Sequence, residues 1–263
     1  MKATSITRPT REIIYLRDLL QELVARDIKL RYRRSILGMA WSLLNPLAEL
    51  LVLTFVFTFI LPVRIPNFIT FLYTGVLSWS WFRASLYNGT SAIVNNRELI
   101  RLPGFPIAIL PVVSTAANFI HFLLSLPILG MFIALSGLKI SGTIALLPFV
   151  MTVQFLLTIS LIYFLAAIHV TFRDTQYLLG IALMLGFYLS PIFYQVKNVP
   201  PQYLPVYNLN PMVHIIEAYR SILIYGSQPD LKNVAIIAIM SLILLFIGLL
   251  IFRRASFQFV EEV

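Results

Sequence analysis

The sequence predicts an all-α integral membrane protein with six transmembrane helices, an N-terminal amphipathic interface helix, and a re-entrant outer helical hairpin between transmembrane helices 5 and 6. Of the 263 residues, 59% are hydrophobic and only 12% are charged. A soluble domain carries about a quarter charged residues, and the mean hydropathy here is +0.87. The apolar excess therefore requires lipid as the surrounding solvent.

Residues 1–34 form a cytoplasmic N-terminal segment, and residues 35–263 form the transmembrane domain. Apolar side chains recur at helical spacing over 11–34 with charged ones between them, which predicts an amphipathic helix. Beside a membrane span such a helix lies in the headgroup plane, although a small soluble helical cap is an alternative. Residues 1–34 contain no apolar core of a signal peptide. The interface helix and its junction with the first span include Asp27, Arg31, Tyr32, Arg33 and Arg34.

Six apolar stretches follow, separated by short polar or Pro-containing segments. A span needs about 20 apolar residues to cross about 30 Å of hydrocarbon. The fifth stretch is short, and the last one is expected to stop at Arg253 and Arg254. The expected spans are about 37–61, 68–94, 105–135, 143–170, 177–193 and 234–252.

Residues 194–233 are too polar and Pro-rich to cross the bilayer, yet too apolar for a free loop. An amphipathic helix is expected over 212–225, with Asn210 as its N-cap, Pro211 in its first turn and Gly226 at its end. We interpret the segment as a re-entrant or surface-lying hairpin that packs against protein or water.

The distribution of basic residues predicts the orientation. With the N-terminus inside, the inner segments carry 14 Lys and Arg, nine of them before residue 35, and the outer segments carry five. Cytoplasmic loops are enriched in Lys and Arg, so both termini are expected in the cytoplasm and the protein in the inner (cytoplasmic) membrane. The basic cluster beside the first span is typical of contact with anionic membrane lipids rather than nucleic acid.

No enzyme site is expected in this chain. There is no paired-carboxylate motif, no cysteine and no G-x-x-x-x-G-K-[ST] phosphate loop. His121, His169 and His214 are widely spaced, so no metal site is expected. The chain also lacks a 20–50-residue repeat and inverted-repeat symmetry, which disfavours a secondary transporter.

Two ionisable residues, Glu49 and Arg83, lie inside predicted spans. A charge at the bilayer centre costs about 2.5–3.5 kcal/mol on insertion scales, so each should face protein or water. They could line a polar pathway or contact another subunit, whereas Glu49 could also snorkel to the surface. The accompanying aromatic residues could form interfacial belts or stack against sugar rings. The residues concerned are Trp79, Trp81, Phe82, Arg83, Tyr87, Phe187, Tyr188, Phe193 and Tyr194.

Several motifs together resemble the membrane-spanning subunit of type-2 ABC exporters for cell-surface polysaccharides such as O-antigen, capsule and teichoic acid. The resemblance covers nearly the whole chain. Its most specific part is the entry into the first span, residues 27–38 with 41–46. Residues 96–101, 105–106, 109–111, 173–174 and 210–211 also match, whereas Leu102-Pro103-Gly104 departs from the family pattern.

The resemblance implies a homodimer that binds two copies of a separate ATP-binding subunit, with ATP and Mg²⁺ on that partner and no cofactor on this chain. The implied substrate is a lipid-linked polysaccharide. Alternatives are a drug or lipid exporter permease of the same superfamily and a secondary small-solute transporter; a membrane-embedded glycosyltransferase is disfavoured because no acidic pair is present.

The resemblance also implies that the aromatic residues of the second and fifth spans, with Arg83, are the channel-lining candidates, and it assigns roles to two further segments. An outer gate would include Asn210, Pro211, Glu217 and Arg220. The inner loop would couple the chain to the ATPase, with an ordinary topogenic loop as the alternative. The implied coupling residues are Asn96, Arg97, Glu98, Leu99, Ile100, Arg101, Phe105 and Pro106.

Overall fold

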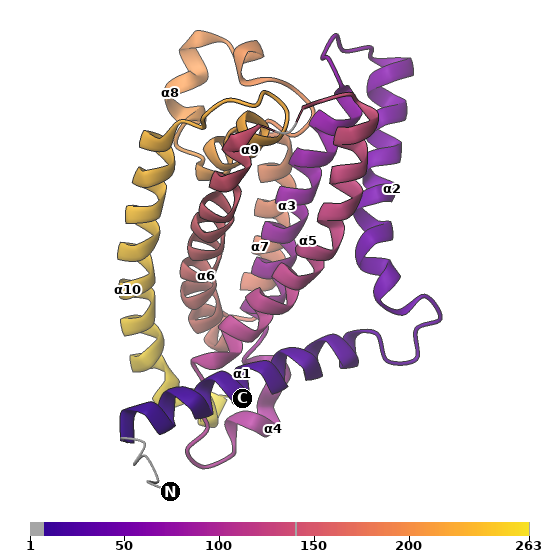
Figure 1. Ribbon diagram of the computed structural model, residues 1–263. Coiled ribbons are helices and arrows are strands. Elements are labelled where there is room, and N and C mark those ends of the chain that lie inside the picture. Colours follow the sequence, from indigo (N-terminus) through magenta and orange to yellow (C-terminus); the bar gives the residue numbers. More distant parts are fainter. Residues whose placement is uncertain (1–7, 140, 263) are drawn as a thin grey trace, which may run out of the picture.

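The computed structural model describes residues 8–139 and 141–262, which contain helices and no strand (Figure 1). One helix, α1 (Arg8–Arg31), lies across one end of a helical bundle, close to the short α4 (Arg97–Ile100). The short α8 (Leu204–Tyr207) and α9 (Pro211–Leu223) lie at the opposite end. The long helices of the bundle are α2 (Trp41–Phe55), α3 (Phe68–Thr90), α5 (Ile109–Leu135), α6 (Leu147–Thr171), α7 (Thr175–Tyr188) and α10 (Leu231–Glu262).

Short helical turns extend or connect these helices. The turns are η1 (Gly38–Ala40), the π-helical η2 (Val56–Ile60), η3 (Val94–Asn96), η4 (Gly142–Leu146), η5 (Val196–Asn198) and η6 (Pro201–Tyr203). The predicted amphipathic helix is present as α1, shifted three residues toward the N-terminus. The chain then turns into α2 through Arg34 and Gly38, whose φ angles of 65° and 50° lie in the left-handed region that glycine adopts readily.

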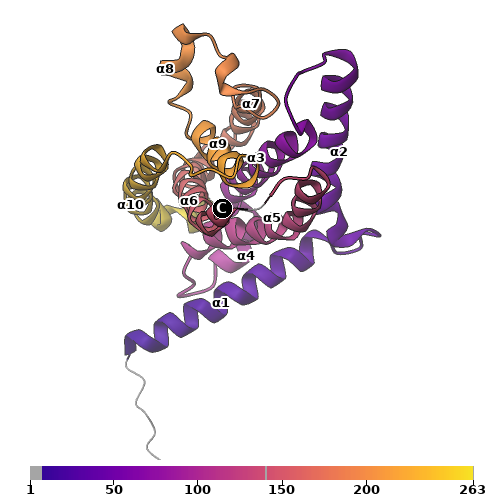
Figure 2. The same ribbon diagram turned by 45° about the horizontal axis from the view of Figure 1, so that its top comes forward.

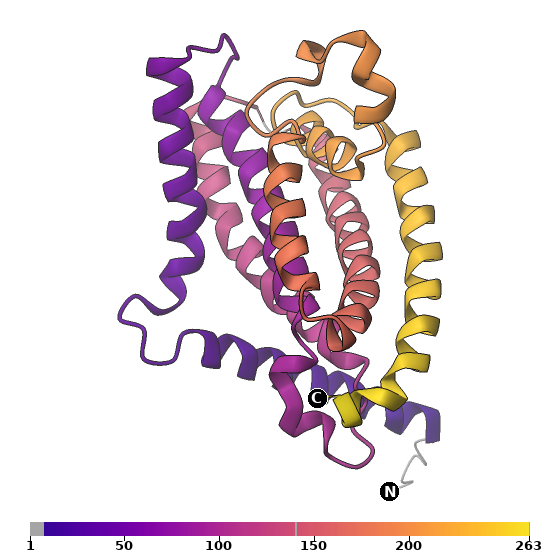
Figure 3. The same cartoon turned by 180° about the vertical axis from the view of Figure 1, so that it is seen from behind.

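Helix α3 lies at the centre of the bundle and contacts α2, α5, α6, α7 and α9, while α2 and α10 lie on opposite sides (Figures 2 and 3). Close packing around α3 depends on small residues. A Cβ atom added at Gly89 would lie 2.6 Å from Ile162 Cγ2 on α6, and one added at Gly186 on α7 would lie 2.8 Å from Trp79 Cη2. Neither position has room for a larger side chain.

Among the described residues, four helical segments are long and apolar enough to span a membrane: 38–60, 109–135, 142–171 and 231–256. Helix α3 has 23 residues but buries polar side chains such as Thr74, Ser78 and Ser85. Its neighbours are other helices, so it needs less hydrophobicity than a lipid-facing helix. Helix α7 has only 14 residues. The all-helical membrane class is confirmed, and the count of six spans stays a prediction.

Two helices end elsewhere than the corresponding predicted spans, whose bounds stay predictions. Helix α7 ends at Tyr188 rather than 193, because Pro191 disfavours the helical conformation at the residue before it. Helix α10 continues past Arg253 and Arg254 to Glu262. Arginine is a good helix former, and Phe252 and Phe259 hold the extension by packing edge-to-face, with ring centroids 5.2 Å apart.

Candidate functional site

The N-terminal helix α1 packs along α5 and leaves part of its apolar surface uncovered. Leu23 and Val24 are each only 8% exposed, against the bundle. Ile13 and Tyr15, near the start of the helix, are 67% and 56% exposed. One part of the apolar surface of α1 thus anchors it to the bundle, and another part remains accessible.

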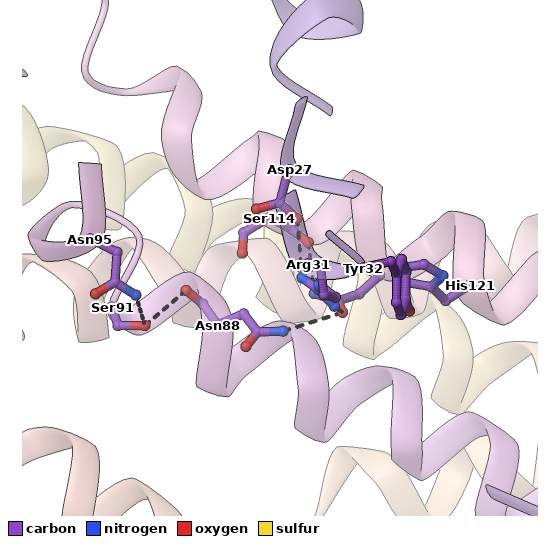
Figure 4. Close-up of polar contacts among 9 residues, drawn as sticks. Asp27, Arg31, Tyr32, Asn88, Ser91, Asn95, Ser114 and His121 are labelled. Carbon is purple, nitrogen blue, oxygen red and sulfur yellow. Dashed lines mark hydrogen bonds and ion pairs between the residues drawn. The ribbon is translucent and has the colours of Figure 1, made fainter. Parts of the chain in front are cut away.

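The last turn of α1 is attached to α5 and α3 by polar contacts (Figure 4). The Arg31 guanidinium donates to Asp27 Oδ2 at 3.1 Å and to Asn118 Oδ1 at 2.8 Å. Asn118 Oδ1 also accepts from Asn88 Nδ2 at 3.3 Å, and Asn118 Nδ2 donates to the Ser114 carbonyl at 2.8 Å. Asn118 on α5 therefore joins the interface helix to the central helix.

Tyr32, which directly follows α1, extends these contacts. Its hydroxyl lies 3.4 Å from His121 Nε2, and the two rings meet edge-to-face with centroids 5.5 Å apart. The predicted junction residues Arg33 and Arg34 are exposed in the loop that follows. We call the connected set the junction cluster: Asp27, Arg31, Tyr32, Asn88, Asn118 and His121.

A polar path leads from the junction cluster along α3 toward α4. Ser91 Oγ donates to the Asn88 carbonyl at 3.3 Å and accepts from Asn95 Nδ2 at 3.2 Å (Figure 4). Asn96 Nδ2 donates to the Ala92 carbonyl at 2.8 Å. The end of α3 and the loop that contains α4 are in this way connected to α1.

The predicted coupling loop presents charged side chains on its surface. Arg97, Glu98 and Arg101 are exposed, whereas Ile100 is only 4% exposed and fixes α4 to the bundle. The remaining predicted residues of this loop, Asn96, Leu99, Phe105 and Pro106, are half-buried. The loop thus combines a packed base with an accessible charged surface.

A cavity of about 400 Å³, which we call the junction cavity, lies between the junction cluster and α2. Its lining includes two arginine side chains and two indole rings. A second cavity of about 230 Å³ lies on the other side of Arg31, between α1 and the end of α3. The lining of the junction cavity includes Arg31, Tyr32, Trp41, Asn45, Ser80, Trp81, Arg83, Asn118 and His121.

The two charges predicted inside spans pair with each other. Arg83 Nη2 on α3 lies 3.3 Å from Glu49 Oε2 on α2. The arginine side chain is 45% exposed and the glutamate side chain 24%, so the pair reaches the surface of the chain. It borders a cavity of about 490 Å³, also lined by Tyr87 and Tyr188.

The predicted aromatic residues separate into buried and accessible groups. Trp81 stacks on Phe122 with centroids 4.7 Å apart, inside the bundle. Trp79, Phe82 and Phe187 are also buried. Tyr87 and Tyr188 are exposed, and Phe193 and Tyr194 are half-buried.

The predicted outer residues form a tightly packed unit. Asn210 caps α9 by accepting from Met212 N at 3.0 Å, with Pro211 as the first helical residue, as predicted. Asn210 Nδ2 also donates to Ser190 Oγ at 3.0 Å. The cap therefore connects α9 to the segment that follows α7.

Arg220 on α9 is fully buried rather than placed on an accessible surface. It donates to Glu217 Oε1 at 2.9 Å, to the Ile192 carbonyl at 2.9 Å and to the Phe71 carbonyl at 3.3 Å. Its guanidinium carbon lies 3.4 Å from the centre of the Phe71 ring. Burial lowers the pKa of Arg220 to about 10, while the Glu217 carboxylate opposes the shift, so Arg220 is charged at neutral pH.

Sequence reasoning missed Asn88, Asn118 and His121. Asn118 and His121 lie three residues apart on α5, which places them on the same face of the helix. That spacing indicates a polar face on α5, but nothing in the sequence shows that Arg31 packs against this face. Within the described residues no group of three His, Cys, Asp or Glu could hold a metal ion.

Comparison with known proteins assigns the chain to a family. The model of the ABC-2 type transporter membrane family matches residues 18–224. The chain belongs to this ABC-2 family. The match begins within α1 and ends just after α9, so it includes the junction cluster, the α4 loop and the outer helix. The family expected from the sequence motifs is confirmed.

Named relatives of this ABC-2 chain match it over most of its length. An O-antigen export system permease protein, RfbA, from Myxococcus xanthus is 35% identical over 258 residues, covering 97% of this chain and 99% of the relative. A protein with the same name from Klebsiella pneumoniae is 29% identical over 94% of this chain and 95% of its own. The polysialic acid transport protein KpsM from Escherichia coli is 27% identical over 89% and 92%.

Proposed function

We propose that this chain is the membrane subunit of an ATP-driven exporter that moves a lipid-linked polysaccharide outward across the inner membrane. The observation that carries the proposal is the end-to-end similarity to the Myxococcus xanthus O-antigen permease, over 97% of this chain. The chain would act as a homodimer with two copies of a separate ATP-binding subunit, which would bind ATP and Mg²⁺.

In this proposal α2, α3, α5, α6, α7 and α10 cross the membrane, and both termini face the cytoplasm. An even number of crossings fits the placement of α1 and the end of α10 at one end of the bundle (Figure 1). The basic residues support this orientation, because the inner segments carry 14 Lys and Arg and the outer segments five.

The α4 loop would dock on the ATP-binding subunit, because its exposed Arg97, Glu98 and Arg101 offer a charged surface on a packed base. The polar path from Asn95 to Arg31 would then connect docking to the position of α1.

The channel would lie along the face that carries Glu49 and Arg83. Tyr87 and Tyr188 are accessible to a sugar chain on this face, whereas Trp79 and Trp81 would support the wall from within. The segment 194–233 would close the outer end, with Arg220 fixing α9 to α3.

The test is purification of the tagged chain from native membranes in mild detergent, combined with analysis of cells that lack the chain. We expect an ATPase with a phosphate-binding loop in a 1:1 ratio, and accumulation of lipid-linked glycan on the cytoplasmic side of the deletion strain. Recovery of an intact dimer without an ATPase, or normal glycan export in the deletion strain, would overturn the proposal.

A further inference from the structure

The junction cavity has the chemical character of an anion site. Its lining includes Arg31 and Arg83 and, among the described residues, contains no aspartate or glutamate. The carboxylates that pair with these arginines point elsewhere: Asp27 lines the neighbouring cavity beside α1, and Glu49 lines the cavity beside α7. The junction cavity is therefore lined by two guanidinium groups whose paired carboxylates lie outside its lining.

Both guanidinium groups retain donors for a ligand. Arg31 donates hydrogen bonds to the side chains of Asn118 and Asp27, and Arg83 donates one to Glu49. A guanidinium group carries five N–H donors in a planar fork, which suits the oxygen atoms of a phosphate. A phosphate entering the cavity could bind both arginines without first breaking either ion pair.

Three uncharged polar atoms of the lining residues also lack partners among the described residues. Ser80 Oγ, Trp81 Nε1 and His121 Nδ1 are buried and make no hydrogen bond within the described residues. A buried polar atom without a partner costs about 1–3 kcal/mol, and all three residues line the same cavity. These atoms lie just beneath the cavity surface, so a ligand oxygen atom would reach them only after a small shift of the side chains.

The cavity lies toward the α1 end of the bundle, where the proposed orientation places the lipid headgroups. It is bordered by the end of α1, by Trp41 at the start of α2, and by Arg83, seven residues before the end of α3. At 1.5 Å per helical residue, Arg83 is about 10 Å from that end of α3. Indole rings such as Trp41 are typical of the headgroup region of a bilayer.

We propose that the junction cavity binds the phosphate or diphosphate ester of a membrane lipid, with Arg31 and Arg83 as its cationic ligands. The phosphate site itself does not depend on the proposed function. The identity of the lipid does rest on it: the lipid would be the anchor of the exported glycan rather than a bulk phospholipid. Tyr32 and Asn118 would position Arg31, and the loop between α1 and α2 would border the entrance.

Binding to the full-length dimer in mild detergent, measured by native mass spectrometry, tests this proposal. The probes are hexadecyl diphosphate, hexadecanol, phosphatidylglycerol and inorganic pyrophosphate. We expect hexadecyl diphosphate to bind and hexadecanol not to bind. Arg31→Gln and Arg83→Gln should each raise the Kd of hexadecyl diphosphate about tenfold, the effect of losing one charged hydrogen-bond donor.

Two variants serve as matched comparisons. Arg64→Gln removes an exposed arginine at the other end of the bundle and should leave the Kd within about twofold. Glu49→Gln frees Arg83 from its carboxylate and should lower the Kd or leave it unchanged. An unaltered dimer peak on gel filtration shows that each variant is folded.

The probes also separate the possible sources of the phosphate. Arginine-dependent binding of phosphatidylglycerol with the same Kd would support the phosphate site and assign it to bulk lipid; preference for hexadecyl diphosphate would assign it to a substrate anchor. Competition by pyrophosphate would support recognition of the phosphate itself. Equal binding by Arg31→Gln, Arg83→Gln and wild type, or equal binding of hexadecanol, would overturn the site, even if an ATP-binding subunit copurifies and export is intact.

Discussion

Arg220 is the residue on which the outer end of the molecule most depends. It has no contact with solvent, yet its charge is compensated by Glu217, by the carbonyl groups of Phe71 and Ile192, and by the ring of Phe71. Removing Arg220 would leave the Ile192 carbonyl buried without this donor and the partly exposed Glu217 carboxylate without its cation, which costs more than losing a surface ion pair.

We therefore expect Arg220→Met to destabilise the protein by about 3 kcal/mol or more. The measurement is the apparent Tm of the purified chain in detergent. Arg64→Met is the matched control, because Arg64 is an exposed arginine of the same end of the bundle, and its Tm should match wild type. Equal Tm values for the two variants would show that the buried contacts of Arg220 contribute little.

At the scale of elements, Gly75 on α3 allows α9 and the segment after α7, which contains Ile192, to pack close to α3. A Cβ atom at Gly75 would lie 3.0 Å from Arg220 Nη2 and 3.1 Å from Ile192 Cα. One of these contacts is backbone and the other is held by several hydrogen bonds, so neither can move away easily. Overpacking of this kind costs about 1–3 kcal/mol.

Gly75→Ala should accordingly lower the apparent Tm, whereas Gly130→Ala in α5 should leave it unchanged or raise it. No atom lies within 4 Å of a Cβ built at Gly130, and replacing a helical glycine by alanine gains about 0.5–1 kcal/mol. Both substitutions add the same methyl group. A similar change in apparent Tm for both variants would therefore show that close packing at Gly75 does not cause the loss of stability.

The α4 loop gives a second prediction at this scale. Because Glu98 and Arg101 are exposed while Ile100 holds the loop in place, alanine at either charged position should weaken docking without unfolding the chain. We expect Glu98→Ala and Arg101→Ala each to reduce glycan export about tenfold, which lies within the range of typical coupling between two sites. Membrane insertion and ATPase activity should persist.

Export and ATP hydrolysis are measured in the same vesicles, with Arg64→Ala at the other end of the bundle as the control. Export at the wild-type rate in both loop variants would remove the coupling role from this loop.

For the molecule as a whole, local features were predictable from sequence and long-range ones were not. The Asp27–Arg31 pair and the Asn210 cap depend on residues four or fewer positions apart, and helical spacing alone predicts them. The contact of Arg31 with Asn118 spans 87 positions, and the Glu49–Arg83 pair spans 34.

Such contacts depend on how each helix is rotated against its neighbours. When nearly every face of a helix is apolar, the hydropathy pattern does not indicate which face packs against the neighbouring helix. For the same reason, Trp79 and Trp81 could not be distinguished in sequence from the accessible Tyr87, and the burial of Arg220 could not be predicted.

The orientation of the whole molecule can be tested by labelling, because the chain contains no cysteine. Leu102 beside α4 and Gln202 beside α8 are both exposed, at opposite ends of the bundle. If the basic residues set the orientation as proposed, a membrane-impermeant maleimide applied to spheroplasts should modify Gln202→Cys. Leu102→Cys should react only after the membrane is permeabilised.

Labelling of both variants in intact spheroplasts would place both ends of the bundle outside and would contradict a bundle that spans the membrane. Labelling of Leu102→Cys alone would mean the opposite orientation, in which the α4 loop could not contact a cytoplasmic ATPase.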